Sequence, residues 1–331
     1  MTTHTKIHLA FRSSVRPAGG LALGLAVLSF FGGTEFTQAG FNLGDAANYA
    51  VLYEGSGGHN LQINSSPLAG STILGNIGLG DENGGNPQAQ LNNPAVITGN
   101  VNFAGSINYN GNAVVHGTTN GGVTAVETDL NYLNGLSSTL GAEAGAALTI
   151  SLSGSGGSQT INASSGDLDA TGNRVFNLTS MTFNSGNTLT INGDGAGDSV
   201  VINVAESNIN NPHFSGAINL TGGLTPNQVL FNITGGNSVM LTGGSTLQTS
   251  ANNATQDATY LDPNGTITMN SVNIDGHVFG GDSSDMQIVS GATIVAAVPE
   301  PQPLALVALG LVGLLVKRRG TRAVPLISKV P

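Results

Sequence analysis

The chain has 331 residues, of which 49 are glycine, none is cysteine or tryptophan, and only 8% are charged. Ordinary globular domains carry about 25% charged residues, so Asn, Ser, Thr and Gly must cover most of this surface. The formal net charge of −10 argues against nucleic acid as a partner, because phosphate binding requires basic residues. Without cysteine, disulfides, thiol nucleophiles and zinc–cysteine clusters are excluded.

The basic residues lie at the two ends of the chain. Between residues 40 and 298, Arg174 is the only Lys or Arg, against seventeen Asp and Glu residues. The middle of the chain is therefore acidic with a low density of charge. This composition suits an extracellular domain and predicts neither nucleic-acid nor anionic-lipid binding.

The first 39 residues have the three parts of a secretory signal. Met1–Arg16 is basic, Leu21–Phe31 is apolar, and Thr37 and Ala39 supply small residues before a cleavage site. This order is typical of a signal peptide removed in the mature protein, with the cut between Ala39 and Gly40. A retained N-terminal anchor is the alternative.

Short apolar segments separated by Gly, Asn and Pro fill residues 40–298 and predict a mainly β domain. The clearest are residues 61–63, 73–77, 95–97, 101–103, 107–109, 148–150, 175–178, 189–191, 200–204, 229–233, 267–269, 272–274 and 277–279. Strands this short, turning often on Gly and Asn, fit a β-solenoid or a β-sandwich. The many Asn and Gly residues and few aromatic residues favour the solenoid. No fixed repeat length is present, so its rungs should be irregular.

One helix is predicted within this domain, at residues 123–144. Thr124 and Glu127 have the spacing of a capping box, and Leu130, Leu133 and Leu140 recur at helical spacing. We expect the helix to break or fray near Gly135. A loop with chance periodicity is the alternative. A single amphipathic helix among strands should lie along the solenoid or cap one end.

The C-terminal segment, residues 299–331, joins three features. Pro299, Glu300 and Pro301 precede the apolar run 304–316, and Lys317, Arg318 and Arg319 follow it. The run has thirteen residues, whereas about 20 make a comfortable membrane span. It therefore predicts a short transmembrane helix. The basic trio should stay in the cytoplasm, which leaves the preceding domain outside. An ordinary anchor or a chance apolar segment is the alternative.

This tail resembles the PEP-CTERM sorting signal of Gram-negative bacteria. The apolar run is short for that family, and residues 320–331 extend beyond its usual end. The resemblance implies processing by an exosortase-type enzyme, membrane association during sorting, and a final place at the cell surface or in the extracellular matrix.

A second resemblance involves residues 42–49, 214–220, 224–233 and 267–281. These segments are similar to the choice-of-anchor A surface proteins, and more distantly to ice-binding and adhesion β-helices that also contain one helix. The likeness implies a secreted β-helical domain with exopolysaccharide or other surface proteins as partners.

No catalytic motif is present in the sequence. Nucleophile-elbow, dinucleotide-binding and phosphate-loop patterns are all missing. Histidines 59, 116, 213 and 277 stand apart from one another and are expected to be solvated turn residues. A pair of carboxylates that cleaves glycosides is an alternative, although the sequence does not identify which residues would form it.

Two segments have calcium-like spacing, and polar turns are the alternative for both. Asp167 and Asp169 begin an EF-hand-like loop, but Leu178 occupies position twelve, where a bidentate Glu is needed. Asp194 and Asp198 lie in one glycine-rich turn. We predict no required cofactor, with calcium as a candidate ligand.

Ice binding would require flat arrays of Thr-x-Thr. Only residues 188–190 and 266–268 have this form in convincing strands, and two isolated pairs do not make such an array. The sequence therefore predicts a non-enzymatic structural or adhesive surface protein. The alternatives are a carbohydrate-active solenoid enzyme and a calcium- or ice-binding module.

Overall fold

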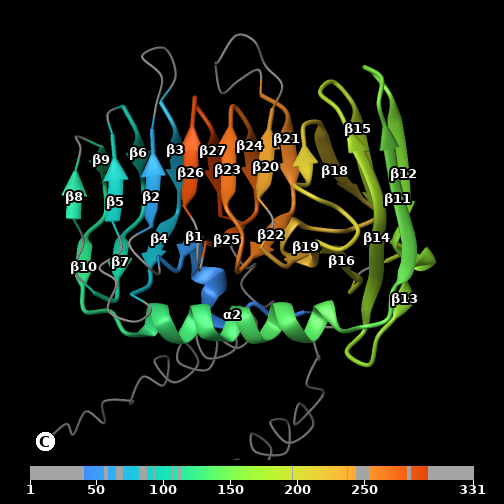
Figure 1. Ribbon diagram of the computed structural model, residues 1–331, viewed down its shortest axis with the longest axis horizontal. Helices are drawn as coiled ribbons and strands as arrows, with labels where there is room; N and C mark the ends of the chain where they lie inside the picture. The colour runs from blue at the N-terminus through green and yellow to red at the C-terminus, as the bar shows by residue number, and fades with distance from the viewer. Residues whose placement is uncertain are drawn as a thin grey trace, which may run out of the picture. The chain divides into compact units, whose positions relative to one another are not determined.

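The computed structural model describes residues 41–296, except 56–58, 65–69, 82–87, 93, 106–107, 111–112, 196, 237, 244–252 and 282–284. These residues form an irregular β-solenoid with three sheets and one long helix, which confirms the predicted fold class (Figure 1). The predicted N- and C-terminal hydrophobic helices lie outside the described residues.

Sheet I has eleven strands. They are β1 (Tyr49–Tyr53), β4 (Asn76–Leu79), β7 (Val101–Phe103), β10 (Thr119–Gly121), β11 (Ala146–Leu152), β13 (Asp167–Leu168), β14 (Asn173–Phe183), β16 (Ser199–Ala205), β19 (Val229–Thr234), β22 (Thr259–Asp262) and β25 (Val278–Gly280). All pairs are parallel except the short β13–β14 pair.

Sheet II has nine parallel strands. In spatial order they are β12 (Ser158–Asn162), β15 (Thr188–Asn192), β18 (Ala217–Thr221), β21 (Thr255–Asp257), β24 (Asn273–Asp275), β27 (Thr293–Val295), β3 (Thr72–Leu74), β6 (Val96–Ile97) and β9 (Val114–Val115).

Sheet III has seven parallel strands and stops short of the β11–β14 end. In spatial order they are β17 (His213–Phe214), β20 (Val239–Thr242), β23 (Ile267–Asn270), β26 (Met286–Val289), β2 (Asn60–Ile63), β5 (Gln88–Leu91) and β8 (Asn108–Asn110). The described 3-10 helices are Gly44–Asn48 (η1), Ala163–Ser165 (η4) and Pro226–Gln228 (η5).

The order of the rungs in space differs from their order along the chain. From β1 the rungs stack toward β10 at one end, and α2 (Ala125–Gly141) then carries the chain back along sheet I. The rungs resume at β11 and stack back toward the middle, where β25, β26 and β27 pair with β1, β2 and β3 (Figure 1). The first and last described rungs are therefore neighbours.

Helix α2 covers the outward face of sheet I. Val126, Leu130 and Leu133 pack against a second apolar layer that is separate from the solenoid interior. The sheet side of this layer is formed by Tyr49, Leu52, Val201, Leu230, Leu261 and Phe279. Because each buried large apolar side chain contributes roughly 1.5–3 kcal/mol, this layer fixes the helix on the sheet.

Two details of the predicted helix were wrong. Thr124 makes no side-chain capping bond, and the Glu127 carboxylate instead accepts from the backbone N–H of Asp81. The helix also continues unbroken past Gly135. The buried apolar face of α2 stabilises the helix, so the helix requires neither a Thr124 side-chain cap nor a strong helix former at Gly135.

The segment 73–77, predicted as one strand, is two strands on different sheets. Gly75 has φ +152° and separates β3 from β4. A Cβ at this residue would lie 2.9 Å from the Cβ of Ala296. Glycine therefore makes the corner between sheets II and I.

A ladder of asparagines joins the C-terminal half of α2 to sheet I. Asn177, Asn203 and Asn232 are register partners on neighbouring strands. Asn232 Nδ2 donates to Asn203 Oδ1 at 2.9 Å, and Asn203 Nδ2 donates to the carbonyl of Leu140 at 2.8 Å. Ser137 Oγ donates to Asn232 Oδ1 at 2.6 Å. The ladder thus satisfies a carbonyl in the last turn of the helix, which has no partner within the helix itself.

Candidate functional site

The outward face of sheet II is a regular, exposed surface of the described solenoid. Most of its inward positions are apolar, as in Leu189 and Ile191 of β15, with Gln159 and Gln256 as the polar exceptions, and the alternate positions point outward. Sheet I is covered by α2, whereas no described helix covers sheet II. We call its outward side chains the sheet II face.

Parallel registration arranges the sheet II face in two rows that cross the strands. The first row is Ser158, Thr188, Ala217, Thr255, Asn273, Thr293, Thr72, Val96 and Val114. The second row is Thr160, Thr190, Asn219, Asp257, Asp275, Val295, Leu74, Thr98 and His116.

The two rows form a grid. Neighbouring strands are about 4.8 Å apart, and outward side chains of one strand repeat at about 6.7 Å. Serine, threonine and asparagine occupy most positions near β12, whereas Leu74 and Val114 are 40% and 49% exposed toward the other end. Such a grid can contact a flat, repeating surface through many weak contacts.

Two acidic side chains interrupt the sheet II face. Asp257 and Asp275 are register partners on β21 and β24. Burial, and then the charge of Asp275, raise the pKa of Asp257. Burial raises the pKa of Asp275, and nearby His277 opposes that rise. The two carboxyls are therefore easier to protonate than exposed aspartates.

The structure does not bring Asp167 and Asp169 into a cation site. The Asp169 carboxylate accepts bonds from the backbone and side chains of Thr171 and Asn173, at 2.6–3.1 Å. Its pKa is lowered by these donors, although burial alone would raise it. This is a self-contained turn between β13 and β14, because N–H and O–H donors occupy the oxygens that a cation would need.

Asp194 and Asp198 do lie together. The backbone N–H of Asp194 donates to Asp198 Oδ2 at 2.6 Å, and Arg174 Nη2 lies 3.8 Å from Asp194 Oδ2. A side-chain hydrogen bond with Asp198 raises the pKa of Asp194. Within the described ranges, no group of three His, Asp or Glu side chains is placed to hold a metal ion.

The four histidines among the described residues occupy different environments. His116 is exposed at the end of the sheet II face, and His59 Nδ1 lies 3.4 Å from Asp285 Oδ1. His277 was expected on the surface, but it is fully buried. Its Nδ1 lies 2.6 Å from the carbonyl oxygen of Tyr49, and its Nε2 lies 2.8 Å from Asn227 Oδ1. His277 therefore links the first rung to the last.

The two Thr-x-Thr segments lie on different faces. Thr188 and Thr190 belong to the sheet II face, next to Ser158 and Thr160. Thr268 belongs to sheet III, beside Met240 and Gln287. Thr188 and Thr190 thus belong to the first and second rows of the sheet II face, which their sequence spacing alone does not reveal.

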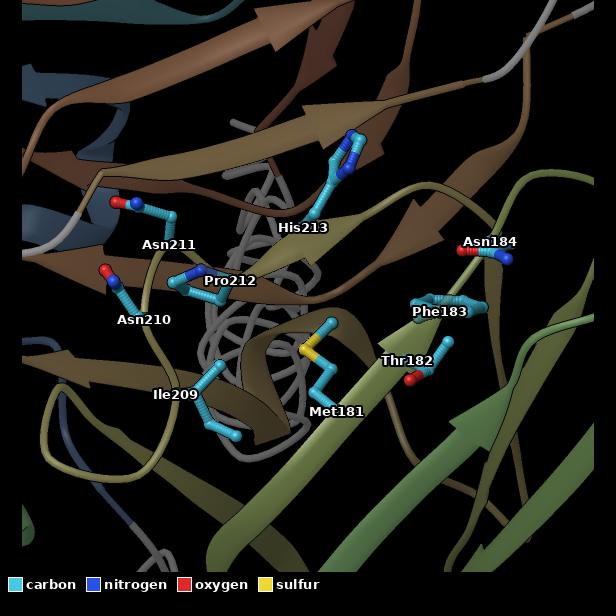
Figure 2. Close-up of a pocket in the computed structure, with 9 residues that line it drawn as sticks. All are labelled: Met181, Thr182, Phe183, Asn184, Ile209, Asn210, Asn211, Pro212 and His213. Atoms are coloured by element: carbon cyan, nitrogen blue, oxygen red, sulfur yellow. The ribbon is translucent and has the colours of Figure 1, made fainter.

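A pocket of about 190 Å³ lies between the end of β14 and the loop before β17. Figure 2 shows Met181, Ile209 and Pro212 around it, with Asn184 and His213 at its edge. Burial lowers the pKa of His213, whose Nε2 lies 3.2 Å from Thr242 Oγ1.

The predicted sorting residues Pro299, Glu300, Pro301 and Lys317–Arg319 lie outside the described residues, as does the apolar run 304–316. Among the helices that the structure describes, none is long and apolar enough to cross a membrane.

Sequence reasoning missed most of the sheet II face because its residues come from rungs of unequal length. Thr72, Thr255 and Thr293 share one row although they are far apart in the chain. A local signal existed in the polar residue that precedes a buried isoleucine, as in Thr72-Ile73, Asn273-Ile274 and Thr293-Ile294.

Residues 40–290 match the family described as "Putative Ice-binding-like adhesive domain". Among solved structures, the chain is similar to an ice-binding protein from Antarctomyces psychrotrophicus, with 16% identity, a TM-score of 0.45, and coverage of 78% of this chain and 98% of that one. An ice-binding protein from Arctic yeast shares 16% identity and a TM-score of 0.48, covering 80% and 98%. An ice-binding protein domain from Shewanella frigidimarina shares 12% identity and a TM-score of 0.44, covering 77% and 97%. No curated protein matches the chain.

Proposed function

Because the chain belongs to the ice-binding-like adhesive domain family, we propose that it is a non-enzymatic adhesive protein that works outside the cell. The sheet II face would be its contact surface. The observation that carries this proposal is the grid of outward Ser, Thr and Asn side chains on a sheet that no described helix covers. Many weak contacts in a fixed spacing suit an extended, repeating partner such as a polysaccharide layer.

A face-specific comparison tests this proposal. Asn219→Tyr places a bulky side chain on the sheet II face, whereas Thr268→Tyr places the same side chain on sheet III. We expect the first substitution to reduce attachment of the full chain to an exopolysaccharide layer and the second to leave attachment unchanged. Equal attachment by both variants and the wild type would remove the sheet II face from the mechanism.

Ice is the second candidate partner, and the hydroxyl row favours it. Ser158, Thr188, Thr255, Thr293 and Thr72 share one row of the sheet II face. An ice-recrystallisation assay with Thr188→Tyr, and with Thr268→Tyr as the matched control, separates this function from adhesion to a polymer. Inhibition by the wild type that only Thr188→Tyr abolishes would support ice as the partner.

We further propose that residues 1–39 direct export and that residues 299–331 are a PEP-CTERM signal processed by an exosortase-type enzyme. The support is the order of Pro299–Pro301, the apolar run 304–316 and Lys317–Arg319 in the sequence. The protein would associate with the membrane during sorting and then reach the cell surface or matrix. Truncation after Val298 should abolish surface retention, and unchanged retention would contradict the sorting role.

A further inference from the structure

The pocket next to β17 exists because sheet III ends before the solenoid does. The β14 rung passes from sheet I directly to β15 in sheet II, so β17 is the last strand of sheet III. Beyond β17, the loop of residues 209–212 lies opposite residues 181–184 at the end of β14, and the space between them is the 190 Å³ pocket (Figure 2).

The pocket has a polar rim and a buried apolar floor. Phe183, Ile209 and Pro212 are buried, whereas Thr182, Asn184, Asn210, Asn211 and His213 are exposed. None of the nine lining residues is Asp, Glu, Lys or Arg. Burial lowers the pKa of His213, which favours its neutral form. The pocket therefore has no charge with which to hold an ion.

Two rim asparagines are held in place by the surrounding backbone. Asn184 Nδ2 donates to the carbonyl oxygen of Ser153 at 2.6 Å, and Asn211 Oδ1 accepts from the N–H of Ser238 at 3.2 Å. Asn211 also has a left-handed backbone, with φ 51°. Among the described residues, Asn184 Oδ1 and Asn211 Nδ2 have no hydrogen-bond partner, so one acceptor and one donor are available at fixed places.

We propose that this pocket binds one ring of a neutral sugar. A sugar hydroxyl both donates and accepts, which matches a rim that offers amide oxygens, amide nitrogens and a threonine hydroxyl. The C–H face of the ring would lie against Met181 and Ile209. A volume of 190 Å³ is below the roughly 300–1,000 Å³ of pockets for larger ligands, so it limits the contact to a single ring.

This site is separate from the sheet II face and does not depend on it. A neutral sugar ring can come from a free monosaccharide or from one unit of a glycan. The chemistry of the pocket is the same for both sources. A glycan would extend past the rim, where Asn210 is exposed.

The methyl group of Met181 provides a direct probe of the pocket. The chain contains five methionines, and Met181 lines the pocket while Met240 is exposed on sheet III. In methyl-labelled full-length protein, we would titrate glucose, galactose, N-acetylglucosamine, glucuronate and a neutral glucose trisaccharide. The Met181 signal is assigned by its loss in Met181→Leu.

We expect a saturable shift of the Met181 signal with at least one neutral sugar, and no shift of the Met240 signal. Glucuronate should have no effect. Thr182→Trp should weaken the binding about tenfold or more by filling the pocket. Ser180→Trp is the matched control, because Ser180 is also exposed on β14 but does not line the pocket. Tighter binding of the trisaccharide than of glucose would identify a glycan as the source, and equal binding would identify the free sugar.

Three results would overturn the proposal. They are the absence of a Met181 shift with every neutral sugar, an equal shift with glucuronate, and equal loss of binding in Thr182→Trp and Ser180→Trp. Unchanged methyl signals elsewhere in each variant would show that its fold is intact. Because attachment through the sheet II face is tested by Asn219→Tyr, failure at the pocket and failure of adhesion are distinguishable.

Discussion

The side-chain nitrogen of Gln159 donates a 2.7 Å hydrogen bond to the carbonyl oxygen of Thr149. The same amide accepts from the N–H of Ser151 at 3.0 Å, so Gln159 of β12 binds two backbone groups of β11. Because the backbone N–H of Ser151 donates to Gln159, it points away from β14, the strand that pairs with β11. Gln159 therefore occupies the edge where a further strand would otherwise add.

Gln159→Leu should open this edge. Two backbone groups of β11 lose their partner, and exposed strand edges promote association between molecules. We expect a larger mass than the wild type in light scattering after gel filtration. Thr160→Leu adds the same side chain at an outward position of β12 and should leave the mass unchanged. An unchanged mass for Gln159→Leu would show that the edge is protected in another way.

Asn232→Ala should detach the C-terminal half of α2 from sheet I. The substitution leaves Ser137 and Asn203 without the Asn232 amide group that each of them binds. Unsatisfied buried polar groups cost about 1–3 kcal/mol each, so the free energy of unfolding should fall by at least that amount in urea denaturation. Asn219→Ala, at an exposed position, should change it by less than about 0.5 kcal/mol. Equal effects would contradict the ladder's role.

The stability of the protein should fall as the pH rises through neutrality because of Asp262. Burial raises the pKa of this carboxyl to about 8, while an unfolded aspartate has a pKa of about 3.9. Between those values unfolding releases a proton, so higher pH favours the unfolded chain by up to about 1.4 kcal/mol per pH unit. Urea denaturation across this range should show that the free energy of unfolding falls less steeply with pH in Asp262→Asn than in the wild type. An identical slope in the variant would contradict the buried neutral carboxyl.

Gly276→Ala should be strongly destabilising. Gly276 has φ +145°, and a Cβ there would lie 2.1 Å from the carbonyl oxygen of Ala258. We expect a loss of more than about 2 kcal/mol, which would be measured as a lower thermal midpoint. Gly154 has no atom within 4 Å of an added Cβ, so Gly154→Ala should leave the midpoint nearly unchanged. Similar midpoints for the two variants would contradict the close approach at Gly276.

The individual strands could be predicted from the sequence because each carries its own signal. The apolar segments at 189–191 and 200–204 reappear as β15 and β16. The period of two places every second side chain in the interior, whereas Val201 belongs to the layer under α2. The helix was also predictable from the spacing of Leu130, Leu133 and Leu140. These features depend on local residues alone.

The order of the rungs could not be predicted in the same way. The pairing of β1 with β25 joins residues from opposite ends of the domain, and no local pattern specifies it. For the same reason the sheet II face was missed, because its rows depend on which rungs are neighbours. Buried His277 also has long-range partners, Tyr49 and Asn227.

The pairing of the first rung with the last has a consequence for export. Val51 pairs with Val278, so during the export proposed above β1 would lack one of its two neighbours until nearly the whole domain had crossed the membrane. Contacts of high sequence separation form slowly because a long loop must close first. A solenoid in sequential order can grow rung by rung as it emerges, whereas this chain would not complete its central rungs during the proposed translocation. Its topology would thus delay completion of the fold until translocation of the domain was nearly finished.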